Sequence, residues 1–395
     1  MIAHTLHEES FVKLTVEQFE LINNKHNLYV FFDQDKYKRF KANYPSIPLI
    51  FWKAKNDLKG YDIKGVIIHF LTFESARFII DLPGNVPVLW SSYGYDLYES
   101  AVFSHYRLYG KATADYIRST RRYPSIVYSV KQSLLNKLSS EGITAKKALK
   151  KVDFVSSVVP TEFCNFPDGV QRRAKYIRIN MGLHRYFDEF TLPDFTRSDE
   201  FSNLSVYVGN NTRKTNNHLD LIPIILGSEL KHDFIFNLQL SYPDSESVYS
   251  RYVRQEFQNK LSNRINVYSD FLDYESYKRI LGQNSIFLFN SYRQQGMGAI
   301  YDALWSGGKV FLSEKNPALS YLKDLGVRIF SLERDLPILS EAELKAPFDN
   351  EVVFHNRRCL LADVSDELRL KRAKTAVDTL IDQYEHPGMS KKKTG

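Results

Sequence analysis

Two polar, glycine-containing segments of this chain have the composition of anion-binding loops. Ser291-Tyr292-Arg293-Gln294-Gln295-Gly296-Met297-Gly298 lies between an apolar run at 285–289 and a helical run at 299–305. A helix that begins directly after such a loop offers free N–H groups and the positive end of its dipole. A second segment of this kind, Gly209 to His218, follows the apolar run 205–208. Together they predict a ligand with a diphosphate and polar ends, such as a nucleotide sugar.

We expect the second half of the chain to hold this ligand through backbone N–H groups, cations and amide side chains. The predicted donor-binding residues are Gly209, Asn210, Arg213, Thr215, Asn216, Tyr242, Arg293, Gln294, Gln295, Gly296, Met297 and Gly298. Tyr242 would stack on the donor base. Simpler roles stay open for some of them: a surface ion pair for Arg293 or Arg213, a strand end for Gly209 and a turn for Tyr242.

Polar residues also follow two predicted strands in the first half. His69 ends the run 66–68, and Asp96 closes the segment that follows the run 86–90. If a sugar is transferred from this nucleotide sugar, the donor, to a second molecule, the acceptor, we predict both as catalytic residues. His69 would hydrogen-bond the acceptor or the donor diphosphate, and Asp96 would orient the acceptor or the histidine. Tyr93 and Gly94 would bind the acceptor. A structural histidine and a helix N-cap at Asp96 are the alternatives.

The elements that must position these residues alternate between short apolar runs and helical patterns. This alternation predicts an α/β fold with two Rossmann-like parallel-sheet domains. Ligands of such sheets bind outside the carboxyl ends of the strands, where both segments lie. The predicted strands are 28–32, 49–51, 66–70, 86–90, 154–158, 176–179, 205–208, 234–238, 265–268, 285–289, 309–312 and 328–330.

A polar stretch at 182–202 predicts the domain boundary. We expect an acceptor-binding domain at 1–190 with a basic insertion at 111–147, and a nucleotide-sugar-binding domain at 191–362. A C-terminal helix in 363–395 would cross back to the first domain and precede a disordered basic tail.

Composition excludes several protein classes. No apolar run approaches the roughly 18 residues of a membrane span, and the N-terminal residues lack a signal-peptide pattern, so we expect a cytoplasmic protein. Two cysteines, Cys164 and Cys359, argue against a disulfide framework or a zinc site. We expect neither a metal nor a cofactor.

Positive charge gathers in the first half of the chain. Residues 1–195 contain 27 Lys and Arg against 20 Asp and Glu, whereas the remainder is balanced. The segment 111–151 alone contains ten basic and two acidic residues, with apolar residues interleaved. Such a segment favours an anionic membrane surface as partner, and a solvated helical face is the alternative. We expect no nucleic-acid partner, because no recognised motif is present.

Several motifs resemble those of the bacterial TDP-N-acetylfucosamine:lipid II N-acetylfucosaminyltransferases of enterobacterial common antigen synthesis. The stretch 89–99, LWSSYGYDLYE, is similar to the family's W…GxDLYE element. Val208-Gly209-Asn210 with Thr215, Asn216 and His218 resembles VGNS…SNEH, and Arg293 to Gly298 resembles RQQGxG. Asn316-Pro317 and His69 also match. The resemblance runs in order from about residue 65 to 325, but Ser91 replaces a His, Tyr93 replaces a Trp, and the basic insertion is extra.

The resemblance implies the GT-B fold, in which two Rossmann-like parallel-sheet domains face a central cleft. It also implies a glycosyltransferase that moves an amino-deoxy sugar from a nucleotide diphosphate to a lipid-linked saccharide acceptor, with retention and without a metal. It further implies bacterial surface polysaccharide synthesis at the cytoplasmic face of the inner membrane. Two alternatives remain: a teichoic-acid-type polyol-phosphate transferase, which would need a pair of catalytic histidines, and a non-catalytic scaffold of the same fold.

Overall fold

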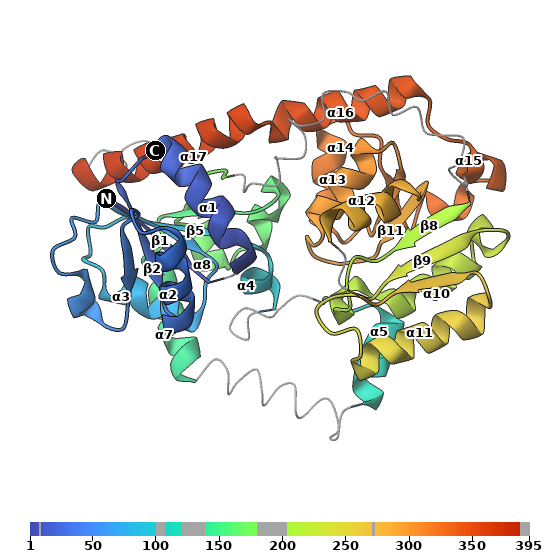
Figure 1. Cartoon of the computed structure of the whole chain (residues 1–395), viewed down its shortest axis with the longest axis horizontal. Coiled ribbons are helices and arrows are strands. Elements are labelled where there is room, and N and C mark those ends of the chain that lie inside the picture. The colour runs from blue at the N-terminus through green and yellow to red at the C-terminus, as the bar shows by residue number, and fades with distance from the viewer. Residues whose placement is uncertain (8, 100–106, 121–138, 180–203, 271–272, 388–395) are drawn as a thin grey trace. The chain divides into compact units, whose positions relative to one another are not determined.

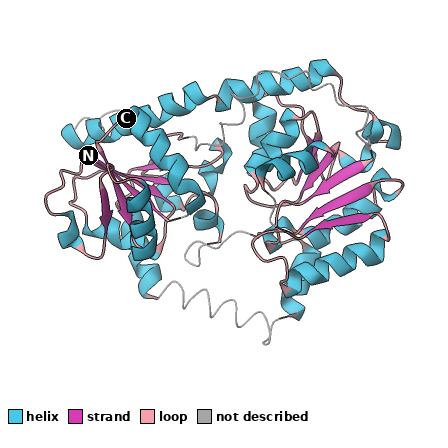
Figure 2. Ribbon diagram, in the orientation of Figure 1, coloured by secondary structure: helices cyan, strands magenta, loops and turns pink. Residues whose placement is uncertain are grey.

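The computed structural model describes residues 1–7, 9–99, 107–120, 139–179, 204–270 and 273–387. The chain forms two compact units. The first takes its described residues from Met1–His105, Ile126–Asp188 and Val364–Gly395, and the second from Tyr106–Ser125 and Glu189–Asp363. Each unit contains one sheet in which every described strand pair is parallel, with helices on both faces, so the α/β prediction is confirmed (Figures 1 and 2).

The first unit is built on a seven-stranded sheet in the order β3-β2-β1-β4-β5-β6-β7. Its strands are β1 (Ile2–Leu6), β2 (Asn27–Phe31), β3 (Leu49–Phe51), β4 (Gly65–His69), β5 (Val88–Ser91), β6 (Phe154–Ser156) and β7 (Lys175–Tyr176). β1 lies between β2 and β4 and is buried along its whole length. Its flanking strands both run the same way, as expected for a sheet whose crossovers are helices.

Helices cover this first sheet, and α17 shows how the sequence pattern places them. Ala373, Ala376, Val377 and Leu380 recur at the spacing of one helix face and pack on the core of the first unit. Leu380 lies directly over Gly65, where an added Cβ would meet the Leu380 Cβ at 2.8 Å. The helices are α1 (Glu9–Ile22), α2 (Gln34–Asn43), α3 (Phe73–Asp81), α4 (Tyr95–Tyr98), α7 (Ser140–Leu149), α8 (Asp168–Gln171) and α17 (Asp366–Glu385), with 3-10 turns η1 (Lys55–Leu58) and η2 (Pro160–Asn165).

The second unit has a six-stranded sheet in the order β10-β9-β8-β11-β12-β13. Its strands are β8 (Ser205–Val208), β9 (Ile235–Gln239), β10 (Ile265–Tyr268), β11 (Ile286–Phe289), β12 (Lys309–Leu312) and β13 (Phe330–Ser331). Its helices are α5 (Lys111–Ser119), α10 (His218–Leu226), α11 (Val248–Leu261), α12 (Tyr274–Gly282), α13 (Met297–Trp305), α14 (Pro317–Asp324), α15 (Glu341–Lys345) and α16 (Asn350–Val364), with η3 (Lys214–Asn216), η4 (Glu229–Lys231) and η5 (Leu336–Ile338). α10 and α11 lie on one face, and α12, α13 and α14 lie on the other (Figure 1).

The structure differs from the sequence prediction at two places. β1 is not among the predicted strands, although it is an interior strand of the first sheet, between β2 and β4. The predicted basic insertion, 111–147, is divided: α5 packs on α10 in the second unit, and α7 packs on α3 in the first. The reason for the first placement is that the Asp220 carboxylate accepts hydrogen bonds from the backbone N–H groups of Ala112 (2.7 Å) and Thr113 (3.0 Å). Residues 121–138 of the insertion, the 182–202 boundary and the tail from 388 lie outside the described residues.

Candidate active site

The centre of the second sheet is a topological switch point. β8 and β11 are neighbours, but the chain continues from β8 to β9 on one side and from β11 to β12 on the other. The loops after β8 and β11 therefore leave the same carboxyl edge in opposite directions. Ligands of doubly wound sheets bind at such a point. Both predicted anion-binding loops thus occupy the expected place.

Hydrogen bonds from Gln295 join the two loops. The Gln295 Oε1 accepts from the Thr215 hydroxyl at 2.7 Å, and its Nε2 donates to the Asn210 Oδ1 at 3.2 Å. A weaker contact reaches the Asn211 Oδ1 at 3.5 Å. Because the amide of Gln295 is used on both sides within the protein, we assign it a positioning role. The structure thus brings together three residues that the sequence predicted for the donor site.

Two glycines allow the loops to approach this closely. Gly296 has φ +71°, and a Cβ there would lie 2.6 Å from the Asn210 Nδ2. Gly209 has φ +72°, and a Cβ there would lie 2.5 Å from the His218 Nε2. Other residues rarely adopt this left-handed backbone conformation. Gly209 therefore has a packing role beyond ending a strand.

The start of α13 has the features of an anion site. Its N-cap is Gly296, which has no side chain to accept from the first-turn N–H groups, so these point to the carboxyl edge of the sheet uncapped. Arg293 precedes the helix with only 5 % of its surface exposed and donates from Nη1 to the Gln294 carbonyl at 2.9 Å. This burial excludes an exposed surface ion pair. The buried Gln294 Oε1 has no hydrogen-bond partner among the described residues.

The start of α10 adds residues that were not predicted. Its N-cap, Asn217, has a left-handed backbone and donates from Nδ2 to the carbonyls of Leu108 and Asn290, both at 3.0 Å. The first residue, His218, is fully buried, and neither ring nitrogen has a partner among the described residues. Burial lowers the pKa of His218 to about 3, so the ring is neutral. Asn217 could have been recognised from the left-handed turn that Asn tolerates, but its partners are distant in sequence.

The remaining predicted donor residues have different surroundings. Asn216 donates from Nδ2 to the Asn211 Oδ1 at 2.7 Å and to the Arg213 carbonyl at 3.1 Å, so it shapes its own loop. Arg213 is half-buried. The Tyr242 carbonyl accepts from the Thr212 hydroxyl at 2.8 Å, while the Tyr242 side chain is 49 % exposed. Met297 is buried and Gly298 is half-buried in the first turn of α13.

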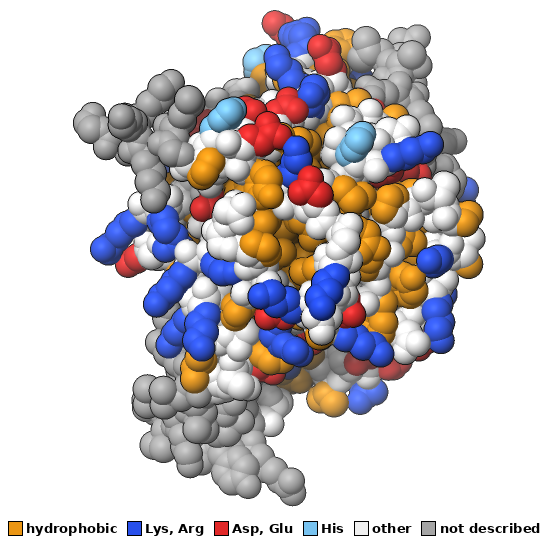
Figure 3. Space-filling view, turned by 90° about the vertical axis from the view of Figure 1, so that its left-hand side faces the viewer, with side chains coloured by type: hydrophobic (Ala, Val, Ile, Leu, Met, Phe, Trp, Pro, Cys, Tyr) orange, Lys and Arg blue, Asp and Glu red, His pale blue; other side chains and the backbone are white. Residues whose placement is uncertain are grey.

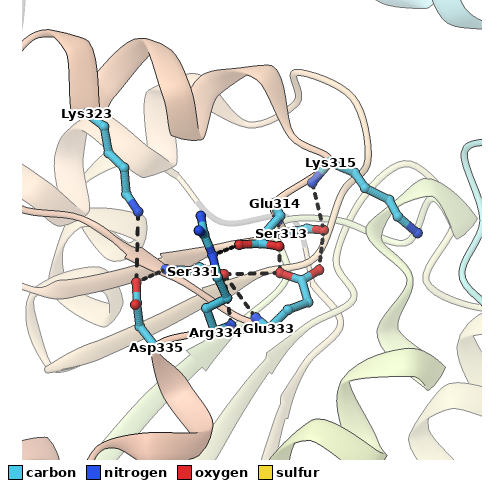
Figure 4. A network of polar contacts seen from close by, with 8 residues as sticks. All are labelled: Ser313, Glu314, Lys315, Lys323, Ser331, Glu333, Arg334 and Asp335. Atoms are coloured by element: carbon cyan, nitrogen blue, oxygen red, sulfur yellow. Dashed lines mark hydrogen bonds and ion pairs between the residues drawn. The ribbon is translucent and has the colours of Figure 1, made fainter.

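A separate polar network closes the same edge of the sheet where β12 and β13 end (Figure 4). The Glu333 carboxylate accepts from the Ser313 hydroxyl at 2.6 Å and from the Glu314 N–H at 2.9 Å. The next residue along the β12 loop, Lys315, places its Nζ 4.1 Å from the centre of the Tyr292 ring. This contact connects the β12 loop to the loop after β11. Sequence reasoning did not single out Glu333 or Lys315, because neither lies in a recognisable motif.

In the first unit, Asp96 is an internal anchor. It is 2 % exposed, and its carboxylate accepts from the Trp90 indole N–H (2.7 Å), the Ser92 hydroxyl (2.9 Å), the Leu71 N–H (3.0 Å) and the Tyr93 N–H (3.1 Å). Burial raises the pKa of Asp96, and these four donors oppose that rise. A carboxylate with four internal donors holds the loop after β5 in place. It is not positioned as a base, and it is not the N-cap of α4, which is Gly94.

His69 lies at the carboxyl end of β4 beside Ser91 of β5 in register. It is 4 % exposed and lies between His4 and Tyr93, and burial holds its pKa well below the ordinary value. The next residue, Phe70, has φ +84°, which is an uncommon and strained conformation for a bulky side chain. Such strain at a strand end is typical of functional sites. Gly94 has φ +92° and starts α4 next to Tyr93.

The described part of the basic segment has two kinds of lysine. Lys151 donates from Nζ to the carbonyls of Ile79, Ile80 and Leu82 at 2.7–3.1 Å, so it caps the end of α3. Lys146 and Lys147 of α7 are exposed. Figure 3 shows lysine and arginine side chains spread over one face of the molecule, with apolar side chains among them. Within the described ranges, none of the helices is both long enough and apolar enough to cross a membrane.

Comparison with known proteins agrees with these features. Residues 185–356 match the model of the 4-alpha-L-fucosyltransferase family, glycosyl transferase group 56. This match supports the resemblance noted from the motifs. No curated protein matches the chain.

Solved structures share the fold at low sequence identity. A glycosyltransferase from Rickettsia africae is 15% identical and covers 97% of this chain and 98% of its own, with a TM-score of 0.59. HepE of Anabaena in complex with UDP is 11% identical over 98% of this chain and 99% of its own, with a TM-score of 0.54. An alpha,alpha-trehalose-phosphate synthase from Burkholderia vietnamiensis is 10% identical over 96% and 99%, with a TM-score of 0.55.

Proposed function

We propose that this chain, which is a glycosyltransferase of the GT-B fold, transfers an amino-deoxy sugar similar to N-acetylfucosamine from a TDP donor to a lipid-linked saccharide in bacterial surface polysaccharide synthesis. The observation that carries the proposal is the Thr215–Gln295–Asn210 bridge, which joins two glycine loops beside the uncapped start of α13. The family description of residues 185–356 supports a deoxyhexose as the transferred sugar. HepE, a protein of the same fold, is described in complex with UDP, which supports a nucleotide diphosphate.

The donor diphosphate would lie at the start of α13. The N–H groups of Met297 and Gly298 and the positive helix end would meet its oxygens, with Arg293 and Arg213 as cations. The Gln294 amide would hydrogen-bond the sugar through its unpartnered Oε1, and Tyr242 would stack on the base. We propose that transfer needs no metal. Among the described residues, no three His, Cys, Asp or Glu side chains gather in a way that could hold one.

In the proposed reaction the bond between the anomeric carbon and the diphosphate oxygen breaks, and a bond from that carbon to the acceptor oxygen forms on the same face. The proton of the acceptor hydroxyl goes to the departing diphosphate. No strong protein base is then needed, which agrees with the internal hydrogen bonding of Asp96. His69, Tyr93 and Gly94 would bind the acceptor, with Asp96 as the residue that positions their loop.

We propose that the enzyme acts as a cytoplasmic protein peripheral to the inner membrane. Exposed Lys146 and Lys147 lie one turn after Ile143, which is 46 % exposed, on the same side of α7. Exposed cations next to an exposed apolar side chain suit an anionic lipid surface. Lys151 does not take part, because its ammonium group is used inside the protein.

The donor site is tested by calorimetry with TDP, UDP, GDP and CDP, first without metal and then with magnesium. We expect one diphosphate to bind without metal, and Arg293→Ala to weaken it about 10- to 100-fold through loss of a charged hydrogen-bond donor. Arg251→Ala is the matched control, because Arg251 is an exposed arginine on α11 of the same unit. Binding only with magnesium would overturn the metal-free mechanism, and no binding by any nucleotide would favour the scaffold alternative.

A further inference from the structure

A row of four hydrogen-bonded side chains crosses the interior of the first unit. It begins at Asn27 at the start of β2, continues through His4 of β1 and His69 of β4, and ends at Tyr93 after β5. The distances are 3.2 Å from the Asn27 Oδ1 to the His4 Nε2, 3.1 Å from the His4 Nδ1 to the His69 Nε2, and 3.3 Å from the His69 Nδ1 to the Tyr93 hydroxyl. In each of these hydrogen bonds one atom donates and the other accepts. Once donor and acceptor are known for the bond at Asn27, they can be assigned for the bonds that follow.

The direction is set at Asn27. Its Nδ2 donates to the Glu20 Oε1 at 2.9 Å and to the carbonyls of Asn23 (3.0 Å) and Phe19 (3.1 Å), which are all acceptors. The opposite assignment of the amide would lose all three bonds, so the atom that faces His4 is the oxygen. An amide oxygen cannot donate. The His4 Nε2 must therefore carry a hydrogen and donate it to Asn27.

The position of the hydrogen on His4 decides which atom donates in the bond between His4 and His69. His4 is fully buried, and burial lowers its pKa to about 3, so the ring is neutral and has only one N–H. Since that N–H is at Nε2, the His4 Nδ1 is an acceptor. The His69 Nε2 must then donate to it. His69 is also neutral, because burial lowers its pKa, so its Nδ1 is an acceptor as well.

Tyr93 stands at the outer end of the row. Its hydroxyl has one hydrogen, and that hydrogen is directed to the His69 Nδ1. The side chain of Thr15 in α1 also interacts with this hydroxyl. With its hydrogen given to His69, the phenol oxygen can only accept from a further group at the carboxyl edge of the sheet. Burial is the main cause of the raised pKa of Tyr93, and the negative charge of Asp96 adds to it. That charge opposes an anion beside the Tyr93 hydroxyl.

We infer that Asn27, His4 and His69 are positioning residues that orient the Tyr93 hydroxyl, so that this edge of the first sheet binds a hydrogen-bond donor of a saccharide and not a phosphate. The donor would be a hydroxyl or an acetamido N–H of the acceptor. This deepens the proposed function, on which it rests, because it chooses between the acceptor and the diphosphate as the group recognised beside His69. The reacting hydroxyl sends its proton to the diphosphate, so the group bound by Tyr93 is a neighbouring one.

The row is tested by long-range ¹H–¹⁵N correlation spectra of the full-length protein labelled with ¹⁵N-histidine at pH 7. We expect His4 and His69 both to be neutral with the hydrogen at Nε2. An imidazolium, or a hydrogen at Nδ1 of either ring, would overturn the inference. This measurement needs neither donor nor acceptor, so its failure is distinct from a failure of the proposed function, which the nucleotide calorimetry tests.

Variants then test the direction of control. Tyr93→Phe removes the outer hydroxyl, and we expect the His69 tautomer to stay unchanged. His4→Phe removes the acceptor of the His69 N–H, and we expect His69 to become a mixture of tautomers. The reverse pattern would show that Tyr93 sets the direction and would overturn the inference. Asn27→Leu removes the acceptor of the His4 N–H, and we expect His4 and His69 both to become mixtures of tautomers, which also provides a variant if His4→Phe fails to fold.

Ligand titrations test what the edge binds. Methyl N-acetylglucosaminide should shift the His69 Nδ1 signal, and inorganic phosphate should not. In kinetics, Tyr93→Phe should raise the KM for the saccharide acceptor about tenfold, the loss of roughly one hydrogen bond, while the Kd for the nucleotide stays within twofold. The inference would be overturned if the His69 Nδ1 signal shifted with phosphate alone or with neither probe. It would also be overturned if Tyr93→Phe weakened nucleotide binding and left the acceptor KM unchanged.

Discussion

The side chains of Thr215 and Gln295 meet at 2.7 Å although 80 residues separate them, and this bond joins the loops that follow the two central strands of the second sheet. Both residues are almost fully buried. A bond between two loops that share one ligand contributes to affinity by holding both in the binding geometry before the ligand arrives. Its loss should therefore affect binding more than folding.

Thr215→Val removes the hydroxyl and keeps the side-chain volume. We expect nucleotide affinity to fall about 5- to 10-fold, the equivalent of roughly 1 kcal/mol, because the Gln295 Oε1 loses its donor. Isothermal calorimetry measures this change. Thr375→Val on the exposed face of α17 is the control, since the hydroxyl that it removes donates to the Lys371 carbonyl of its own helix. Equal affinities for the two variants would contradict the bridge.

Gly296→Ala should damage the same site by a different route. Gly296 has φ +71°, and a Cβ would approach the Asn210 Nδ2 to 2.6 Å, so alanine must strain the backbone and displace Asn210. We expect a loss of about 1–3 kcal/mol in unfolding free energy and little remaining nucleotide binding. Chemical denaturation and calorimetry check both. Gly169→Ala is the control, because nothing lies within 4 Å of a Cβ there and its φ is not positive; a similar effect of both substitutions would refute this account.

Much of the second unit could be predicted from the sequence because its signals are local. The apolar run 286–289, the glycines and the following helix are adjacent, so the Gly296 loop was identified without knowledge of any distant contact. β1 could not be found in this way. It is buried between two strands, where an unbroken apolar run is expected, but His4 and Thr5 interrupt it.

β1 and Asp220 escaped the sequence prediction for the same reason. His4 interrupts the apolar pattern of β1 because it belongs to the buried row that ends at Tyr93. Asp220 likewise has no local signal for its role, because the backbone groups that it caps lie 107 and 108 residues earlier. Polar residues whose partners are distant in sequence cannot be placed from periodicity.

Stability should fall as the pH is lowered below 6.5. His4 and His218 have folded-state pKa values of about 3, against 6.5 in the unfolded chain. Between these values the unfolded state binds a proton on each ring and the folded state does not, so acid favours unfolding. At pH 5 each histidine should cost about 2 kcal/mol relative to pH 8. Urea unfolding at both pH values measures this, and His4→Phe should reduce the difference; an unchanged stability at pH 5 would refute buried, neutral imidazoles.

Asp220→Ala should release α5 from the second unit. The Asp220 carboxylate caps the start of α5 through Ala112 and Thr113, and loss of a helix cap costs about 1–2 kcal/mol. Hydrogen exchange followed by mass spectrometry should show faster exchange in peptides covering 111–119. Asp115→Ala is the control, because Asp115 is an exposed residue within α5 that pairs with Arg118. Unchanged hydrogen exchange of residues 111–119 in Asp220→Ala would contradict the capping of α5 by Asp220.

Lysines of the basic segment should separate into two classes. Lys151→Ala removes an ammonium group that bonds three carbonyls at the end of α3, and we expect a loss of about 1–3 kcal/mol in unfolding free energy. The pair Lys146→Ala and Lys147→Ala removes exposed charges, so stability should change by less than about 0.5 kcal/mol.

Binding to liposomes that contain anionic lipid should weaken in the pair, and in the unsubstituted protein it should weaken as salt is added. If liposome binding changed neither with added salt nor with the paired substitution, the exposed side of α7 would be a solvated helical face. The membrane would then be removed from the proposed function.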